Sequence, residues 1–420
     1  MGRDSLERRP DPRISCEILV RAVPQAKSDD SKLFATRLAL FYAALFVGFG
    51  IHQPFFPVWL RAKGLTDGEV SLVLASALMV RLVATPLITT LADRAGVLST
   101  AVVICAAATT VAYTGVGLAS GVALILLAVL VAHFVWAPMM PLADAYGLAG
   151  VAKRSLDYGR IRVWGSVAFM GANIAGGVLL TMLAPTSIVW MLCLSFVPLL
   201  LASMGLVKDR REPSAGPKGP GYFNRRFVLV MIAAAILQSS HAVYYTFSSI
   251  HWKEHLGYSA ATVGLLWAVA VAAEIIVFWV AGRFTRGWRP TSYLIIGAAS
   301  SIVRWGVMAV DPPLAILAPL QVLHGGGFGL VHLGTMAYLA DRLPPHARAS
   351  GQGTVSIAMG ATMAGATLLS GYFYARVGAG AYFAMALLCL GGLALTLIAR
   401  SLPVPVHRPV FQPHKDGAGG

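Results

Sequence analysis

Charged residues are scarce in this 420-residue chain. Asp, Glu, Lys and Arg make up 12% of the residues, against roughly 25% in an ordinary soluble domain. Hydrophobic residues make up 57%, and the mean hydropathy is +0.71. The shortage of charge excludes an ordinary soluble domain and indicates a chain that is surrounded mainly by lipid.

Cysteine is scarce as well. The four cysteines are scattered, and their spacing matches neither a disulfide framework nor a metal site: Cys16, Cys105, Cys193 and Cys389. We therefore expect them to act as small apolar residues. Neither a bound metal nor a cofactor is expected.

Two enzyme signatures are incomplete. The string His324-Gly325-Gly326-Gly327 matches the oxyanion loop of some esterases, but the chain has no Gly-x-Ser-x-Gly motif to supply the nucleophile. The glycine run also lacks the Gly-Lys-Ser/Thr ending of a phosphate-binding loop, so nothing indicates direct coupling to ATP. We therefore expect neither an enzyme nor a primary pump.

The chain instead contains long apolar runs. Their length fits transmembrane α-helices, and the period-two alternation of a membrane barrel is absent. Twelve runs can be marked, at 36–60, 69–91, 97–119, 121–148, 159–182, 186–207, 226–251, 262–283, 290–310, 312–341, 350–374 and 379–402. The fold class predicted is an all-α membrane protein with twelve transmembrane helices.

Polar stretches divide the chain. The longest polar interruption, residues 208–225, predicts a linker between two six-helix bundles at 36–207 and 226–402. Residues 1–35 are polar and charged, which predicts a disordered tail, and residues 403–420 form a second tail.

The distribution of Lys and Arg predicts the orientation. With both termini on one side, 26 of these residues fall in the tails and loops of that side, and 4 fall on the other: Arg61, Lys63, Lys253 and Arg376. Because Lys and Arg are retained in the cytoplasm, we expect an inner-membrane protein with both termini cytoplasmic. This excess also explains the pI near 10 without nucleic acid, which we do not expect as a partner.

The two halves contain a repeat. The block 64–75 returns 193 positions later as 257–268, and the same offset aligns Arg81 with Glu274. Each charge lies roughly 12 residues, or about 18 Å, into its helix. Charges at that depth are costly and are usually functional. A duplicated membrane protein with such charges indicates a transporter, and a contact between Arg81 and Glu274 is predicted.

Several motifs then carry a family resemblance. Leu91-Ala92-Asp93-Arg94-Ala95-Gly96 resembles the loop signature of the major facilitator superfamily. Residues 158–166, the pair Arg304-Trp305 and residues 320–329 resemble its phenylpropionate permease branch, near the lactose and nucleoside proton symporters. The resemblance covers about 36–402. It implies two pseudo-symmetric six-helix bundles, a monomer, a cavity lined by helices 1, 4, 7 and 10, and contacts between the halves through helices 2, 5, 8 and 11.

The resemblance also implies roles for individual residues. Lactose permease is similar in having an acid on helix 8, arginines on helices 5 and 9 and a histidine on helix 10, and the matching residues here are Glu274, Arg162, Arg304 and His324. Gly327 stands where that permease has a second acid, so a sugar-type site is not favoured. Glu274 and His324 are the candidates for proton coupling.

Further candidates follow from their positions. Aromatic residues that could line the cavity are Trp136, Tyr244, Tyr245 and Trp267. Residues near the cytoplasmic helix ends that could act in gating are Asp93, Arg94, Asp144 and Asp341.

Most of these residues also have a purely structural interpretation. Arg81 could bond to backbone carbonyls, Arg162 could extend to the membrane interface, and Arg304 could be structural. The same applies to His324. Other histidines are interpreted as packing residues: His52, His133, His241 and His332.

The balance of buried charge favours an anionic substrate. Arg81 and Arg304 outnumber Glu274, so an anion would supply the missing negative charge. We expect proton-coupled uptake of a small organic solute, an aromatic monocarboxylate by preference, because arginine binds carboxylates in bidentate fashion. The alternatives are a drug or metabolite exporter, a sugar or nucleoside proton symporter, and a membrane sensor that does not transport.

Overall fold

The computed structural model describes residues 29–206, 224–343 and 345–403, and every element assigned within these ranges is a helix. Ten helical stretches there are long and apolar enough to cross a membrane. One of them, Gly351–Ser401, contains two helices joined by a short 3₁₀ turn. The predicted tail at 403–420 and the linker at 208–225 lie almost entirely outside the described residues.

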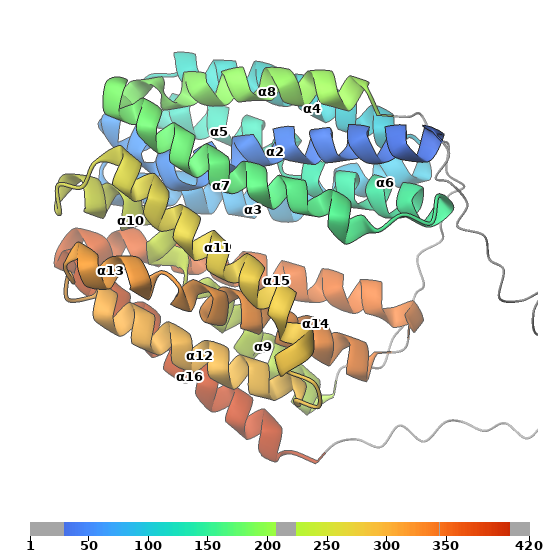
Figure 1. The fold of residues 1–420 in the computed structure, drawn as a ribbon. Coiled ribbons are helices and arrows are strands. Elements are labelled where there is room, and N and C mark those ends of the chain that lie inside the picture. The colour runs from blue at the N-terminus through green and yellow to red at the C-terminus, as the bar shows by residue number, and fades with distance from the viewer. Residues whose placement is uncertain (1–28, 207–223, 344, 404–420) are drawn as a thin grey trace, which may run out of the picture.

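The N-terminal half accounts for the first six predicted runs. Its helices are α2 (Asp29–Ala62), α3 (Asp67–Arg94), α4 (Leu98–Leu118), α5 (Val122–Trp136), α6 (Met139–Lys153), α7 (Tyr158–Met182) and α8 (Ile188–Met204), the last preceded by a 3₁₀ turn at Pro185–Ser187. They form the upper group of helices in Figure 1.

The C-terminal half accounts for the other six. Its helices are α9 (Arg225–Ser239), α10 (Ala242–Glu254), α11 (Ala260–Phe284), α12 (Pro290–Met308), α13 (Leu314–Leu320), the π-helical turn η2 (Gly325–Leu330), α14 (Val331–Arg342), α15 (Pro345–Val377) and α16 (Ala381–Ser401). They form the lower group in Figure 1.

Within the described ranges, the fourth, seventh and tenth predicted runs are each interrupted. Pro138 lacks an amide hydrogen and separates α5 from α6. Between α9 and α10, the Ser240 hydroxyl donates to the Leu237 carbonyl and accepts from the Trp305 indole. In the tenth run, a glycine-rich π turn follows α13. Irregular backbone at membrane depth is tolerated where it is buried in protein or lines a cavity.

Both copies of the repeat form a turn and the start of a helix. Gly64 and Gly257 have φ of +86° and +67°, values that favour glycine. The next helix then begins with a side-chain cap: Thr66 and Glu69 form a capping box on α3, and Ser259 caps α11. The repeat therefore encodes the same local structure in each half.

The first helix begins earlier than predicted, at Asp29 instead of residue 36, while residues 1–28 lie outside the described part. Acidic residues stabilise the N-terminus of a helix, and Asp30 also pairs with Arg154 at 3.0 Å. The Arg154 guanidinium lies 4.3 Å from the centre of the buried Phe34 ring. These contacts hold the added turns against the end of α6.

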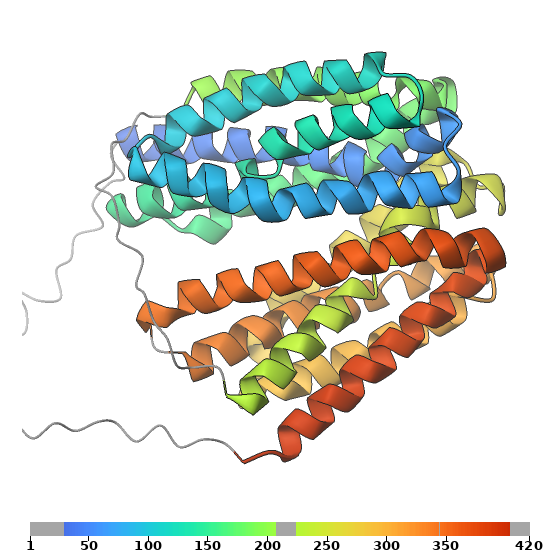
Figure 2. The ribbon, with the colours of Figure 1, turned by 180° about the vertical axis from the view of Figure 1, so that it is seen from behind.

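The halves meet through α3 packed on α15 and α7 packed on α11. Figure 2 shows α3 and α15 running alongside one another. The two groups of helices converge at the end that carries α10 and separate toward the end that carries α6 and α14 (Figure 1). At the converging end, Gly264 lies directly against the backbone of Asn173, and Gly177 against that of Ala260. We call this the closed end.

Candidate functional site

A cavity of about 530 Å³ lies between the two halves. Its walls come from α2, α3, α5, α6 and α7 of the N-terminal half and from α10, α11, η2 and α15 of the C-terminal half. The lining residues that carry the argument are Arg81, Glu274, His324, Trp136, Tyr245 and Trp267. Cavities of this size hold small organic ligands.

Arg304, His324 and Glu274 form a connected polar group beside this cavity. One Arg304 guanidinium nitrogen donates to His324 Nδ1 at 2.9 Å, and the other donates to Gln321 Oε1 at 2.6 Å. Since a guanidinium has no acceptor, His324 Nδ1 must be the unprotonated nitrogen. The imidazole is then neutral, with its hydrogen on Nε2, which lies 3.8 Å from Glu274 Oε2.

Arg304 itself is enclosed. Its side chain is 1% exposed, and its guanidinium carbon lies 4.3 Å from the Tyr244 ring centre and 4.6 Å from that of Trp305. Tyr244 is fully buried and does not line the cavity. Arg304 and Tyr244 therefore support the site from behind, and His324 and Glu274 face the cavity.

Arg81 differs from Arg304 in having no such partners. It projects from α3 into the cavity and is exposed there. Within the described part of the chain, no hydrogen bond or ion pair engages its guanidinium. The predicted contact with Glu274 is not made, because equal depth along two helices does not make their side chains meet. Here α3 packs on α15, and α11 packs on α7.

Arg162 lies near the start of α7. Its guanidinium carbon is 4.1 Å from the Phe46 ring centre and 5.2 Å from that of Tyr42. Arg162 therefore packs over aromatic rings of α2.

The candidate gating residue Asp144 lies in a polar cluster within the N-terminal half. Its carboxylate accepts hydrogen bonds from the hydroxyls of Tyr42 at 2.8 Å and Tyr158 at 2.7 Å. The cluster joins α2, α6 and α7 at the end of the bundle that is away from α10. A gating role for Asp144 stays a prediction.

The other gating candidates occupy helix ends. Asp341 pairs with its neighbour Arg342 at 3.0 Å and is about half exposed. Asp93 and Arg94 end α3, where the Asp93 carbonyl accepts a hydrogen bond from the Gly96 amide. A gating role for Asp93, Arg94 and Asp341 also stays a prediction.

Aromatic rings cover much of the cavity wall. Trp136 stacks on Phe49 with ring centres 4.7 Å apart, and both line the cavity with Tyr245 and Trp267. The Trp267 indole donates to Ser249 at 3.0 Å. The wall thus offers large apolar surfaces fixed by packing and hydrogen bonds.

His52 and His133, which the sequence suggested were packing residues, both lie on the cavity wall. They pack with Trp136, and the His133 Nδ1 atom bonds to the Val129 carbonyl at 3.1 Å. Among the described residues, His52 Nε2 and Trp136 Nε1 have no hydrogen-bond partner. The signal in the sequence was the spacing: His133 and Trp136 follow Val129 by four and seven residues, which places the three on one helical face.

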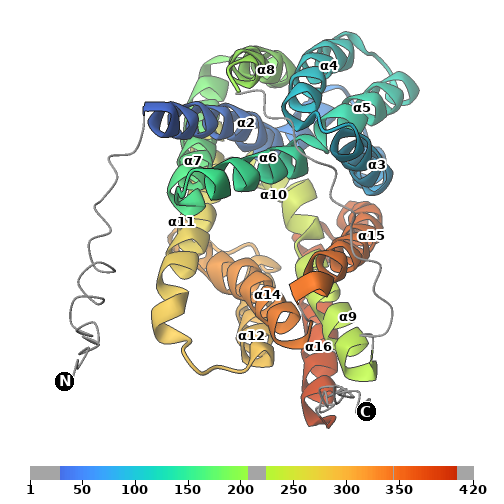
Figure 3. The same ribbon diagram turned by 90° about the vertical axis from the view of Figure 1, so that its right-hand side faces the viewer.

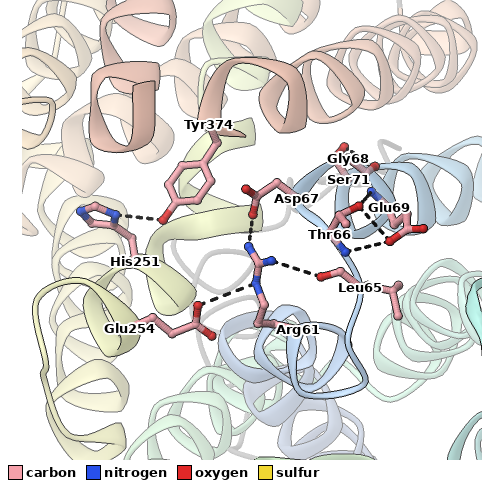
Figure 4. Close-up of polar contacts among 10 residues, drawn as sticks. All are labelled: Arg61, Leu65, Thr66, Asp67, Gly68, Glu69, Ser71, His251, Glu254 and Tyr374. Atoms are coloured by element: carbon pink, nitrogen blue, oxygen red, sulfur yellow. Dashed lines mark hydrogen bonds and ion pairs between the residues drawn. The ribbon is translucent and has the colours of Figure 1, made fainter. Parts of the chain in front are cut away.

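The closed end carries a polar cluster that the sequence analysis missed. The Arg61 guanidinium pairs with Asp67 and approaches Glu254 of the other half at 3.7 Å. Nearby, His251 bonds to the Tyr374 hydroxyl at 2.9 Å, as Figure 4 shows, and to Asp311 at 2.7 Å. Arg61 and Glu254 therefore link the two halves directly.

His251 and His255 are four residues apart with Glu254 between them, a spacing that the sequence analysis overlooked. Their rings stack with centres 5.0 Å apart. In the described part of the chain, no group of three His, Cys, Asp or Glu residues is arranged to hold a metal ion.

Two helical bundles, interrupted helices and ionisable residues around a central cavity define the architecture of a secondary transporter. The model of the MFS_1 like family matches residues 35–385. The chain therefore belongs to this family of the major facilitator superfamily, and it is a multi-pass membrane transporter, not an enzyme.

Comparisons with individual proteins agree. The chain is 32% identical over 366 residues to the "Probable 3-phenylpropionic acid transporter" of Escherichia coli (strain K12), covering 85% of this chain and 96% of that protein. It is 28% identical over 381 residues to the "Maltose permease" of Geobacillus stearothermophilus, covering 87% and 94%. The solved nucleoside transporter NupG has a TM-score of 0.77 at 14% identity, covering 88% of this chain and 100% of that one. The all-α major facilitator fold is thereby confirmed.

Proposed function

We propose that this transporter couples the inward movement of protons to the uptake of a small aromatic monocarboxylate. The observation that carries the proposal is the exposed Arg81 guanidinium in a cavity that also holds Glu274 and aromatic walls. An arginine with no partner among the described residues, in a cavity with largely apolar walls, favours an anion, and its planar fork matches a carboxylate. The printed name of the Escherichia coli relative supports the same substrate class.

The proposed binding mode uses both walls of the cavity. The carboxylate of the substrate binds Arg81. The aromatic ring of the substrate packs against Trp136, Phe49 and Trp267, where aromatic pairs gain energy beyond simple burial. Arg304 fixes the His324 ring, whose Nε2 lies 3.8 Å from Glu274.

Glu274 carries the coupled proton in this proposal. Protonation removes the charge of the Glu274 carboxylate, which changes its attraction to the positive charges around the cavity and so biases the equilibrium between the two conformations. His324 stays neutral in this proposal, because its Nδ1 accepts from Arg304, and its Nε2 lies 3.8 Å from the Glu274 carboxylate.

Alternating access would use the two ends of the molecule. We place the protein in the inner membrane, with the closed end outside and both termini cytoplasmic, because Lys and Arg concentrate on the side of the termini. Asp93, Arg94, Asp144 and Asp341 then lie at the cytoplasmic end, where their proposed role is gating. We expect the monomer to be sufficient for transport.

Uptake into proteoliposomes tests the proposal. Purified protein is given an inward proton gradient and a panel of labelled compounds: 3-phenylpropionate, benzoate, maltose and a nucleoside. We expect accumulation of the aromatic acids alone, abolished by a protonophore. Efflux driven by the gradient would indicate an exporter, and accumulation of maltose or the nucleoside would overturn the substrate class. No movement of any compound would support the sensor alternative.

Reporter fusions test the orientation. Fusions after Lys208 and after Arg408 should both report a cytoplasmic location, and one near Lys253 an external one. An external result after Lys208 would overturn the proposed topology without bearing on the substrate.

A further inference from the structure

A second cavity of about 480 Å³ opens on the outside of the N-terminal half, between α2 and α7. One wall consists of small residues of α2, namely Ala35, Ala39 and Ala43, with Thr36 and Leu40 beside them. The other wall is formed by the start of α7 and the residues before it: Leu156, Asp157, Arg160, Ile161 and Trp164. We call this the α2–α7 groove.

The α2–α7 groove faces away from the other half of the molecule. On α7, Asn173 and Gly177 are the residues against α11. Trp164 precedes Asn173 by nine residues, which is about two and a half helical turns, so the two side chains point in opposite directions. Trp164 is 55% exposed and Leu40 is 60% exposed. Figure 3 places α2 and α7 at the outer margin of the bundle. In a membrane-spanning chain, lipid covers such a face.

The charges in the groove favour an anion. Arg160 is exposed, and its guanidinium has no hydrogen-bond or ion-pair partner among the residues that the structure describes. The other charged group, Asp157, caps α7, where its carboxylate accepts from the Arg160 amide at 3.3 Å. The acid is therefore engaged by the helix N-terminus, while the cation is available.

The groove combines three features at one helix end: a cation, an exposed tryptophan and an apolar channel. Trp164 has the amphipathic character of residues at the headgroup level of a bilayer, and basic pockets between helices bind anionic headgroups. The geometry points to the α2–α7 groove as a binding site for one anionic phospholipid, with its phosphate at Arg160 and an acyl chain along Ala35, Ala39 and Ala43.

Native mass spectrometry of the detergent-purified full chain tests this inference. Protein is titrated with dioleoylphosphatidylglycerol and, separately, with dioleoylphosphatidylcholine. We expect the anionic lipid to bind more tightly to the wild type, and Arg160→Gln to weaken it about fivefold, the effect of one cation near an anionic surface. Binding of the zwitterionic lipid should not change.

Two further variants make the test specific. Arg283→Gln is the matched control, because Arg283 also lies beside an exposed tryptophan, Trp279, at a helix end. It should leave binding unchanged. Ala39→Phe fills the channel and should weaken both lipids, with Ala43→Leu as a milder version if the first does not fold.

The same measurements can overturn the proposed lipid site. Equal binding of the two lipids to the wild type, or equal losses in Arg160→Gln and Arg283→Gln, would overturn it. A dimer that Ala39→Phe converts to a monomer would assign the groove to a second copy of the chain instead. Because the inference depends only on the membrane-spanning fold, its failure would leave the proposed transport function unaffected.

Discussion

Arg81 and Arg304 are both arginines inside the membrane-spanning bundle, one in each half, and their surroundings differ. Arg304 is buried between two aromatic rings and donates to His324 and Gln321. Arg81 lies exposed in the cavity, without a partner among the described residues. A count of charges in the sequence does not distinguish these two arginines. The comparison separates an arginine that organises a site from one that is available to a ligand.

The largest effect is expected from removing Arg304. Arg304→Ala leaves the acceptors on His324 and Gln321 without their donors, at roughly 1 to 3 kcal/mol each. Thermal unfolding of the purified protein should show this loss of stability. Arg81→Ala is the matched control, and its stability should stay within about 0.5 kcal/mol of the wild type, while uptake is lost. Equal destabilisation by both variants would show that Arg304 supports the fold no more than Arg81 does.

Glu274→Gln should abolish accumulation without unfolding the protein. Glutamine mimics the protonated acid in shape and charge, so gradient-driven uptake should stop while equilibrium exchange of the same solute continues. His324→Ala should have a smaller effect on both. The measurement is uptake and exchange in the same vesicles. Accumulation at the wild-type level by Glu274→Gln would show that another group carries the proton.

Double-mutant cycles test which of these side chains interact. Arg81 and Glu274 do not touch in this structure, so the stability changes of Arg81→Ala and Glu274→Ala should add to within about 0.5 kcal/mol. Arg304→Ala and His324→Ala remove two bonded groups, and their changes should deviate from additivity by roughly 0.5 to 3 kcal/mol. Strong coupling between Arg81 and Glu274 would indicate that they pair in another conformation.

The smallest effect is expected at the closed end. The Arg61–Glu254 pair is partly exposed, with a 3.7 Å separation, and such pairs contribute roughly 0.2 to 1 kcal/mol. Glu254→Gln should therefore raise labelling of an Ala270→Cys probe in the cavity by an external, membrane-impermeant thiol reagent less than about fivefold. Lys253→Gln is the matched control and should have no effect. Reduced labelling in Glu254→Gln would contradict a role for the Arg61–Glu254 pair in holding the closed end shut.

Much of the fold could be predicted from the sequence because lipid imposes simple rules on length and composition. The twelve apolar runs correspond to the helices observed, and the repeat at 64–75 and 257–268 forms the same turn and cap in each half. The interruptions were harder to find. Pro138 and the run Gly325–Gly327 gave signals, but the break at Ser240 depends on a bond from Trp305, 65 positions away.

The sequence indicated which residues form the site but only partly how they are arranged. Sequence reasoning located these residues: the repeat singled out Arg81 and Glu274, and the family resemblance singled out His324 and Arg304. It could not show which of them touch, since contact depends on the rotation of each helix and on the packing of α3 with α15. The position of His52 on the cavity wall was missed for the same reason: the sequence around a histidine on an apolar helix is the same whether the side chain faces a cavity or a neighbouring helix.

The glycines at the seam between α7 and α11 have a practical consequence. A methyl group at Gly264 would occupy the space of the Asn173 backbone, and one at Gly177 would meet the backbone of Ala260. Neither partner is a flexible side chain that could move aside. Alanine at these two positions would therefore penalise the present arrangement selectively, which makes Gly177→Ala and Gly264→Ala natural starting points for trapping the opposite conformer for crystallography.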